Sequence, residues 1–500
     1  MSERVPHISG GWADPRVRWG GLLVAGGCLL GGAFAWAPVP VALAVAIGLL
    51  SWMSLRRFSW SILLLLTLRP CLDLASQFGI ALGPIRLNLP AAAGILIFGL
   101  AVFYLVDRRL RGAPLDGGGA PSVAFGVLAF VNLLGILVGG SYGGAGFAAI
   151  AARESVRFLS IWGMYFVLVN LLGEGMEERS IYRALYISMI VPVALGIGEF
   201  FLYLSTGLYN LQDGAPHGRL TGSFFHATAF GFHLAVVIII TLTLLRSTRR
   251  SVPRGVLWVT LVISGWLLVF TFARGAWICL AIGLVVKALL DPRRMLKPVL
   301  VFGVAAAILV GPRVVSRFGD INSSISLGRV LQTRGARLNS FEWRIYNWVV
   351  LAVKAKDRPW LGYGTGATSE VNPHVTSERE GRGFNAHSEW VAYLVEHGIV
   401  GVLALAFYYG RLARWLTVLR RRLSRLAEKR ASGLSPPGDP DLSPDLAGTG
   451  LELLAGFLVV GLFAQVPLEH TSTYYFVAGL LAILRAAERA AMRATDAGRS

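Results

Sequence analysis

Residues 384–401 place a histidine directly before an apolar helix, the arrangement in this chain that best fits catalysis. The segment reads Phe-Asn-Ala-His-Ser-Glu-Trp-Val-Ala-Tyr-Leu-Val-Glu-His-Gly-Ile-Val-Gly. His387 ends a long polar loop, and an apolar helix is predicted to follow it at once. An imidazole changes its protonation near neutral pH, so its position where water meets a membrane predicts proton transfer on a lipid-linked substrate.

Three arginines are candidates for binding an anion near this histidine. Arg274 lies between two apolar runs, Arg344 lies in the long polar loop, and Arg219 precedes the Thr221-Gly222-Ser223 entry of another apolar run. A charge beside an apolar stretch is costly unless it faces protein or water. The planar guanidinium suits the oxygens of a diphosphate. For the loop as a whole, a solvated segment that touches anionic lipid head groups is the alternative.

Two acidic residues and a glycine-rich loop accompany His387. Glu389 could orient the imidazole or simply face the loop, and Glu396 could support the helix end or the histidine. The run Arg358–Gly366 contains Gly-x-Gly-x-Gly, but no strand is expected before it and no helix after it, which disfavours a nucleotide loop. We predict a structural turn, with backbone amides aimed at an anion as the alternative.

Neither a metal site nor a cofactor is predicted. His226 and His233 lie seven residues apart on one predicted helix face, without a carboxylate or cysteine at ligand spacing. The segments predicted to be extracytoplasmic contain no Asp-x-Asp pair that would hold a metal for a nucleotide sugar. Three further histidines are interpreted as loop or cap residues: His217, His374 and His397.

The elements that must position these residues are membrane-spanning helices. The 500 residues are 55% hydrophobic and only 15% charged, and apolar runs of roughly 20 residues, enough to cross a bilayer, recur along the chain. The predicted class is therefore an all-α, polytopic integral membrane protein with about 12–14 transmembrane helices and one long extracytoplasmic loop. The predicted spans are 20–37, 39–55, 59–79, 88–106, 121–140, 154–173, 180–204, 226–245, 254–272, 275–290, 297–311, 388–409, 451–468 and 472–488.

The net charge of +19 is assigned to cytoplasmic anchoring rather than to nucleic-acid binding. Clusters of Arg and Lys alternate between the loops, which places both termini in the cytoplasm. The loop 312–387 is then extracytoplasmic, and an amphipathic helix over 339–356 is predicted to lie on the membrane lipids. We thus expect three regions: the N-terminal bundle 1–311, the extracytoplasmic loop 312–387, and the C-terminal helices 388–500 with a cytoplasmic linker at 412–450. The segment 412–450 is predicted to be a basic helix followed by a Pro/Gly/Asp-rich linker.

Several short motifs together resemble one family, the O-antigen ligase/polymerase superfamily. They are Arg274-Gly275 between two spans, Arg344-x-x-x-Trp348, the Pro359-x-x-Gly-x-Gly-x-Gly366 run, His387 followed by Glu396-x-Gly-x-x-Gly401, and Arg69-Pro70-x-x-Asp73. The resemblance covers roughly residues 215–410, and the rest of the chain only as a pattern of spans. One departure is the acid beside the histidine in Ser388-Glu389-Trp390.

The resemblance implies a metal-independent, inverting glycosyltransferase in a bacterial inner membrane, with its active site facing the periplasm. Its donor would be an undecaprenyl-diphosphate-linked glycan, and its acceptor lipid A-core or a growing polysaccharide. Carried over, Arg274 and Arg344 hold the diphosphate, Arg219 assists, and His387 is catalytic. A protein O-oligosaccharyltransferase uses the same chemistry. The resemblance is therefore compatible with a ligase, a polymerase or an enzyme that glycosylates a protein acceptor. A lipid-linked glycan transporter or flippase is the alternative of a different class.

Overall fold

The computed structural model describes residues 57–74, 79–82, 85–206, 219–224, 226–247, 252–293, 340–372, 385–432, 444–464 and 471–497. The chain divides into two compact units, Met1–Ile62 and Leu63–Ser500, and the account below concerns the second unit. The predicted spans 20–37, 39–55 and 297–311 lie outside the described residues. The division at 311 and 387 stays a prediction.

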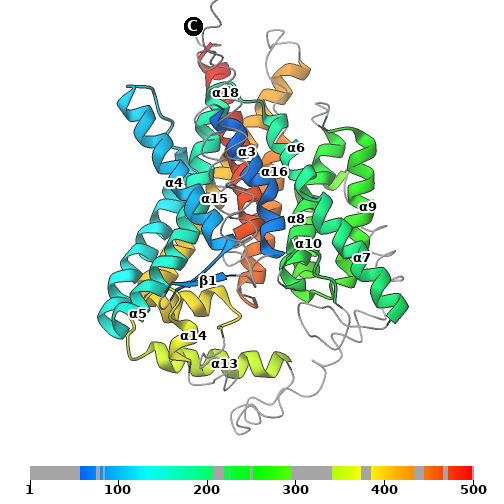
Figure 1. Ribbon diagram of the computed structural model, residues 1–500. Coiled ribbons are helices and arrows are strands. Elements are labelled where there is room, and N and C mark those ends of the chain that lie inside the picture. The colour runs from blue at the N-terminus through cyan, green and yellow to red at the C-terminus, as the bar shows by residue number, and fades with distance from the viewer. Residues whose placement is uncertain are drawn as a thin grey trace, which may run out of the picture. The chain divides into compact units, whose positions relative to one another are not determined.

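Helices dominate the second unit (Figure 1). Their bounds are α3 (Phe58–Leu72, which contains the unit boundary), α4 (Leu89–Leu110), α5 (Gly119–Gly173), α6 (Glu178–Ser188), α7 (Ile190–Thr206), α8 (Ala227–Arg246), α9 (Arg254–Phe270), α10 (Arg274–Leu290), α13 (Ser340–Ala355), α14 (Thr368–Val371), α15 (Glu389–Ala431), α16 (Pro444–Gly461) and α18 (Thr471–Ala497). Within the described residues, six helical segments are long and apolar enough to cross a membrane. The predicted all-α polytopic membrane fold is confirmed.

A short β-hairpin departs from the predicted pattern. Strands β1 (Gly79–Leu82) and β2 (Ile85–Asn88) pair antiparallel, with Gly79 opposite Asn88. Asn88 then begins α4, because its side chain accepts a hydrogen bond from the amide of Ala91 at 3.0 Å. Four-residue strands between two apolar runs leave no period that sequence reasoning can detect, so the hairpin was not predicted.

Helix α5 is a folded-back pair rather than one long rod. Its 55 residues would span about 80 Å if straight, far more than a bilayer core. The backbone leaves the helical region at Gly144, with φ 68° and ψ −156°. The Ser155 hydroxyl donates to the carbonyl of Asn132 at 3.0 Å, and the Trp162 indole donates to Ser122 at 3.1 Å. Both bonds join positions on either side of Gly144, so the halves are antiparallel, in agreement with two predicted spans.

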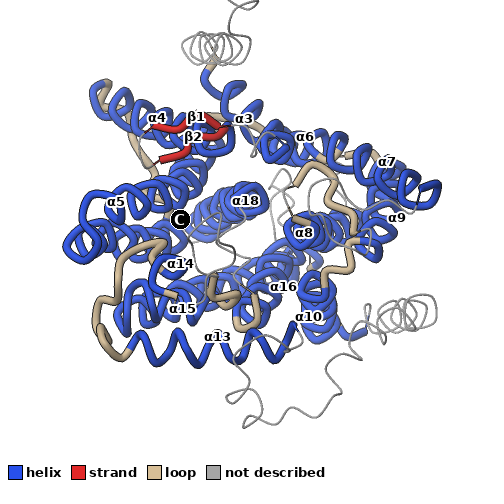
Figure 2. Tube along the Cα trace, turned by 60° about the horizontal axis from the view of Figure 1, so that its bottom comes forward, coloured by secondary structure: helices blue, strands red, loops and turns tan. Residues whose placement is uncertain are grey.

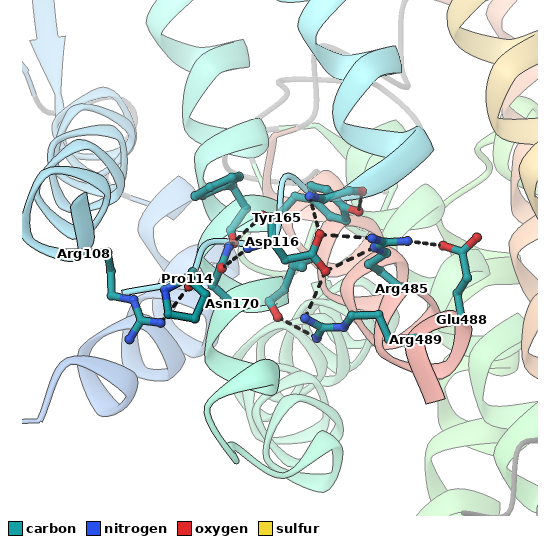
Figure 3. A network of polar contacts seen from close by, with 11 residues as sticks. Arg108, Pro114, Asp116, Tyr165, Asn170, Arg485, Glu488 and Arg489 are labelled. Carbon is teal, nitrogen blue, oxygen red and sulfur yellow. Dashed lines mark hydrogen bonds and ion pairs between the residues drawn. The ribbon is translucent and has the colours of Figure 1, made fainter. Parts of the chain in front are cut away.

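Helix α18 lies at the centre of the second unit and packs against α5, α8, α15 and α16 (Figure 2). Every residue from Ser472 to Leu484 is buried, as expected for a helix that is covered on all sides. Polar groups fix its far end. Asp116, in the connection from α4 to α5, lies 3.1 Å from Arg485 and 3.0 Å from Arg489 of α18 (Figure 3). The Tyr165 hydroxyl donates to the carbonyl of Gly118 in the same connection.

Basic residues gather at the end of the bundle where α8 and α10 finish. Arg246 at the end of α8 pairs with Asp291 at 2.7 Å, and Arg420 of α15 donates to the carbonyl of Leu290 at 2.7 Å. These residues belong to the loops predicted to be cytoplasmic. The basic helix predicted at the start of the segment 412–450 is the final part of α15, which continues to Ala431, and α16 begins at Pro444. Arginine and leucine are good helix formers, which explains the extension.

A buried ion pair joins three helices nearer the middle of the bundle. The ammonium of Lys287 in α10 lies 3.0 Å from both carboxylate oxygens of Glu452 in α16. The same ammonium donates to the hydroxyl of Thr243 in α8 at 2.9 Å. The Lys287 and Glu452 side chains are 4% and 3% exposed, so each charge depends on the other.

Candidate functional site

His387 is held in an uncommon backbone conformation immediately before α15. Its φ of 50° lies in the left-handed region, which a non-glycine residue adopts only when the surroundings impose it. Helix α13 supplies that constraint. The Asn347 amide donates to the carbonyl of Asn385 at 3.0 Å, and the Trp348 indole donates to the carbonyl of Ala386 at 2.7 Å. Both residues directly before His387 are therefore bound to one face of α13.

The helix predicted over 339–356 is present as α13 (Ser340–Ala355), and its contact with membrane lipids stays a prediction. It lies across the end of the bundle at which α8 and α10 begin, and it packs against α15 (Figures 1 and 2). We call this end the site end. Trp343 of α13 meets His387 edge to face, with ring centroids 5.7 Å apart at 74°. The Arg-x-x-x-Trp motif thus serves two purposes, because Trp348 anchors the histidine segment while Arg344 lies one turn earlier.

Arg344 lies beside a second guanidinium at the site end. Its Nη1 donates to the carbonyl of Phe463, just beyond α16, at 3.1 Å. The pKa of Arg344 is lowered by burial and by the neighbouring positive charge of Arg274. Two like charges brought this close favour a bound anion, since an anion relieves their repulsion. The two arginines predicted to act together therefore do lie together.

Arg274 is the first residue of α10, directly after a tight turn. Phe272 has φ 49°, and the Trp277 indole donates back to the carbonyl of Leu268 at 3.0 Å, which closes the turn between α9 and α10. A side chain on Gly275 would approach Phe232 of α8 to 3.2 Å. The Arg-Gly pair therefore combines a charge at the helix start with close packing of α10 against α8.

Arg219 connects the starts of α8 and α10. Its Nε donates to the carbonyl of Thr271 at 3.0 Å, and its Nη2 lies 3.4 Å from the hydroxyl of Thr228 in the first turn of α8. Glu199 of α7 holds the following residues, accepting from the Thr221 hydroxyl and amide at 2.6 and 2.7 Å and from the Gly222 amide at 2.9 Å. Glu199 was not identified from the sequence, because an isolated acid in an apolar run carries no motif.

Electrostatics keep His387 neutral. Its pKa is lowered to about 4, first by burial and then by the positive charge of Arg344 and by His226. The ordinary value is near 6.5, so at neutral pH the imidazole is unprotonated and can accept a proton. His226 is the second residue that sequence reasoning missed. It was considered only as a metal ligand, whereas it immediately precedes α8, in whose first turn the Thr228 hydroxyl lies 3.4 Å from Arg219.

The two acids predicted to support His387 have other partners. Glu389 is buried and accepts a hydrogen bond from the Tyr409 hydroxyl at 3.0 Å, on the inner side of α15. Its other oxygen has no hydrogen-bond partner among the described residues. Glu396 accepts from the Thr368 hydroxyl at 2.7 Å and thereby holds α14. Neither carboxylate contacts the imidazole, so both contribute to the scaffold around His387.

The glycine-rich loop fits into a break in α15. At Gly398 the helix leaves its normal geometry, with φ 63° and ψ −154°. The amides of Tyr363 and Gly364 donate to the carbonyls of Val395 and Glu396 at 3.0 and 2.8 Å. The carbonyls of Pro359 and Trp360 in turn accept from the amides of Ile399 and Val400 at 2.8 and 3.3 Å. The loop therefore replaces the hydrogen bonds that the break removes, in agreement with the predicted structural turn.

The Arg69-Pro70-x-x-Asp73 motif also has a structural role. Arg69 pairs with Asp73 at 2.7 Å, and Asp73 accepts from the Ser472 hydroxyl of α18 at 2.6 Å. The Ser223 hydroxyl donates to the carbonyl of Pro70 at 2.8 Å. The motif thus ties α3 to α18 and to the segment that follows Arg219.

Of the three histidines interpreted as loop or cap residues, the structure describes one. His397, interpreted as a loop or cap residue, is instead buried inside α15, one residue before the break. His217 and His374 lie outside the described residues. Within the part of the chain that the structure describes, no group of three or more His, Cys, Asp or Glu side chains is arranged to hold a metal ion.

Comparison with known proteins identifies one family. Residues 259–406 match the family described as O-Antigen ligase. The matched segment begins within α9 and includes Arg274, Arg344, His387 and the break in α15. No curated protein matches the chain.

Proposed function

The chain belongs to the O-antigen ligase superfamily, and on this premise we propose that it transfers a glycan from an undecaprenyl-diphosphate carrier to an acceptor hydroxyl. The reaction would take place at the outer face of a bacterial inner membrane, with both termini in the cytoplasm and the site end in the periplasm. The observation that supports this best is the juxtaposition of Arg274, Arg344 and a neutral, partly buried His387.

The proposed role of the arginines is to bind the donor diphosphate. As the anomeric carbon–oxygen bond breaks, both bonding electrons go to the diphosphate, whose negative charge increases. Preorganised positive groups lower the barrier most when they face the place where charge develops. Arg274 and Arg344 supply that charge in this proposal, and Arg219 steadies the turn that carries Arg274. No metal ion is needed for the step as proposed.

The proposed role of His387 is that of a general base. Its neutral imidazole takes the acceptor proton while the acceptor oxygen forms the new bond to the anomeric carbon. Direct displacement of the diphosphate from the opposite face inverts that carbon. A positioned general base contributes roughly 100- to 10,000-fold to such a rate. The carrier diphosphate leaves with the electron pair, and the proton on His387 is later lost to water.

The acceptor distinguishes the remaining alternatives within this chemistry. Lipid A-core or another acceptor would make the protein a ligase, a carrier-linked repeat would make it a polymerase, and a Ser or Thr hydroxyl would make it a protein O-oligosaccharyltransferase. We infer that the shape of the loop 312–387, rather than the shared arginines and histidine, determines the acceptor. We propose the broader ligase/polymerase assignment.

A gel of outer polysaccharide from a deletion strain tests the proposal. The strain is complemented with the wild-type chain, with His387→Ala, or with Gly410→Ala as a matched exposed change within α15. We expect wild type and Gly410→Ala to restore acceptor-linked glycan and His387→Ala to fail at equal membrane abundance. Accumulated long carrier-linked chains would indicate a ligase, and acceptors capped by single repeats a polymerase. Restoration by His387→Ala would refute the proposed base.

A further inference from the structure

His226 is placed at the site end by the packing of α8 against α10. A side chain on Gly231 would come within 2.9 Å of Ala273 and 3.0 Å of Ala276, so the first turns of the two helices are in close contact. Both helices start at this end and run in the same direction. His226 immediately precedes α8, and Arg274 is the first residue of α10. The two side chains therefore start from neighbouring helix ends.

Two further contacts restrict where His226 lies. Arg219 spans from the carbonyl of Thr271 to the hydroxyl of Thr228, two residues after His226. From the other side, His226 is close enough to His387 for the two imidazoles to interact electrostatically. His226 thus lies near His387 and two residues before the hydroxyl that Arg219 contacts, and it is exposed.

The surroundings of His226 are rich in groups that attract anions. Arg219, Arg274 and Arg344 contribute three positive charges, and the amino-terminal ends of α8 and α10 add the positive ends of two helix dipoles. An imidazole N–H can donate a hydrogen bond to a phosphate oxygen in either the neutral or the protonated state. A neutral solute would gain little from this arrangement, whereas a diphosphate would gain from each group.

We propose that His226 is a further substrate-binding residue of this site, which donates a hydrogen bond to the diphosphate of the lipid carrier beside Arg219 and Arg274. This inference rests on the proposed function, because it takes the carrier diphosphate as the ligand. It gives the two histidines different roles: His226 binds the leaving group, and His387 takes the proton of the acceptor.

The alternative role for a residue at this position is to cap the helix, and capping can be separated from diphosphate binding by experiment. The His226 side chain makes no capping hydrogen bond to α8. Asparagine is among the best residues at a helix start, so His226→Asn should preserve or raise thermal stability. A binding role predicts the opposite ranking in function, because the shorter asparagine amide cannot reach the place of the imidazole Nε2.

The test measures binding of undecaprenyl diphosphate, without glycan, to the full chain in nanodiscs. For His226→Asn we expect at least a tenfold weaker Kd, since one hydrogen bond to a charged group is typically worth that much or more. His226→Gln, whose amide can replace the Nε2 donor, should recover part of the affinity. The matched control is Glu177→Asn, which alters another uncapped helix start on α6. Its Kd should stay at the wild-type value.

The outcomes separate this inference from the proposed function. Weaker binding in His226→Asn, with partial recovery in His226→Gln, supports the role of His226. Wild-type affinity in His226→Asn overturns that role while leaving the function intact. If His226→Asn does not fold, His226→Ala is measured instead. Wild-type affinity and a normal KM for the glycan donor in His226→Ala would overturn the binding role of His226. Failure of the wild-type chain itself to bind undecaprenyl diphosphate would instead refute the proposed donor.

Discussion

Replacing Gly398 by alanine should destabilise the protein through the break in α15. At φ 63° and ψ −154° the residue occupies a region of backbone space that is essentially limited to glycine. An alanine there costs about 1–3 kcal/mol in backbone strain. The added methyl would also lie 2.4 Å from the carbonyl carbon of Trp360 and 2.5 Å from the carbonyl oxygen of Pro359. Both are backbone atoms, so the contact cannot be relieved by a side-chain rotation.

The collision must move the loop that fills the break. Four backbone hydrogen bonds join residues 359–364 to residues 395–400, and moving the loop weakens or breaks them. At about 1 kcal/mol for each bond, the loss adds up to about 4 kcal/mol to the strain. We therefore expect Gly398→Ala to lower the free energy of unfolding by about 1–7 kcal/mol, the upper end applying if all four bonds are lost. Because His387 directly precedes the same helix, turnover should fall as well.

Two other glycines make the measurement selective. Gly144 has nearly the same backbone angles, but a methyl there would meet nothing within 4 Å, so Gly144→Ala should show the strain alone. Gly410 lies within α15, also with open space, and Gly410→Ala should be neutral or stabilising by up to about 1 kcal/mol. Thermal and urea unfolding in detergent would rank the three variants. Equal stability of Gly398→Ala and Gly144→Ala would refute the argument from the interlocked loop.

Four further results are expected. The value of kcat/KM should fall as the pH is lowered, with a midpoint near pH 4, because protonation of His387 below its lowered pKa removes the base. A midpoint near 6.5 would contradict the burial of the imidazole. Arg344→Gln should move that midpoint to higher pH, since a neighbouring positive charge is lost, and should raise the donor KM at least tenfold; an unmoved midpoint would separate Arg344 from His387. Lys287→Met should cost about 3–5 kcal/mol in unfolding experiments by leaving Glu452 buried and unpaired, and adding Glu452→Leu should restore most of it; no restoration would deny the coupling. Glu199→Gln should weaken donor binding severalfold with little loss of turnover at saturation, because the loop behind Arg219 loses its anchor; wild-type affinity would show that the anchor is dispensable.

The predicted spans agree with the helices because apolar runs are dictated by the membrane. A span in lipid must satisfy every backbone group internally, so a run of about 20 apolar residues permits little besides a helix. The predicted 254–272 and 275–290 correspond to α9 and α10, and 121–140 with 154–173 correspond to the halves of α5. The β-hairpin and the length of α15 were not predicted, since both depend on contacts beyond the apolar runs.

The candidate site could be predicted only where residue type and topology coincide. Arg274, Arg344 and His387 are polar residues next to apolar runs on one predicted face, and the structure brings them together. Sequence proximity misled for Glu389, because successive residues of a starting helix point in different directions and its carboxylate turns inward to Tyr409. Acids with interior hydrogen-bond partners cannot be distinguished from catalytic acids by spacing alone.

The position of His226 was hidden for a related reason. Its proximity to Arg274 at the start of α10 depends on how closely α8 packs against α10, and that distance is set by the small residues Gly231 and Ala276. A hydrophobic pattern predicts that two helices are buried without predicting which neighbours they choose. The histidine was therefore interpreted only through its spacing to His233, a relation within one helix.

The most direct test of the account is single-turnover glycan transfer by the purified protein, with a synthetic undecaprenyl-diphosphate-linked donor and its hydroxyl acceptor. Wild type and His387→Ala are compared at saturating donor, and carrier binding is measured on the same samples. We expect His387→Ala to bind the carrier with wild-type affinity and to transfer glycan at least 100-fold more slowly than the wild type. The wild-type product should have the inverted anomeric configuration. Transfer by His387→Ala at the wild-type rate would contradict the central claim.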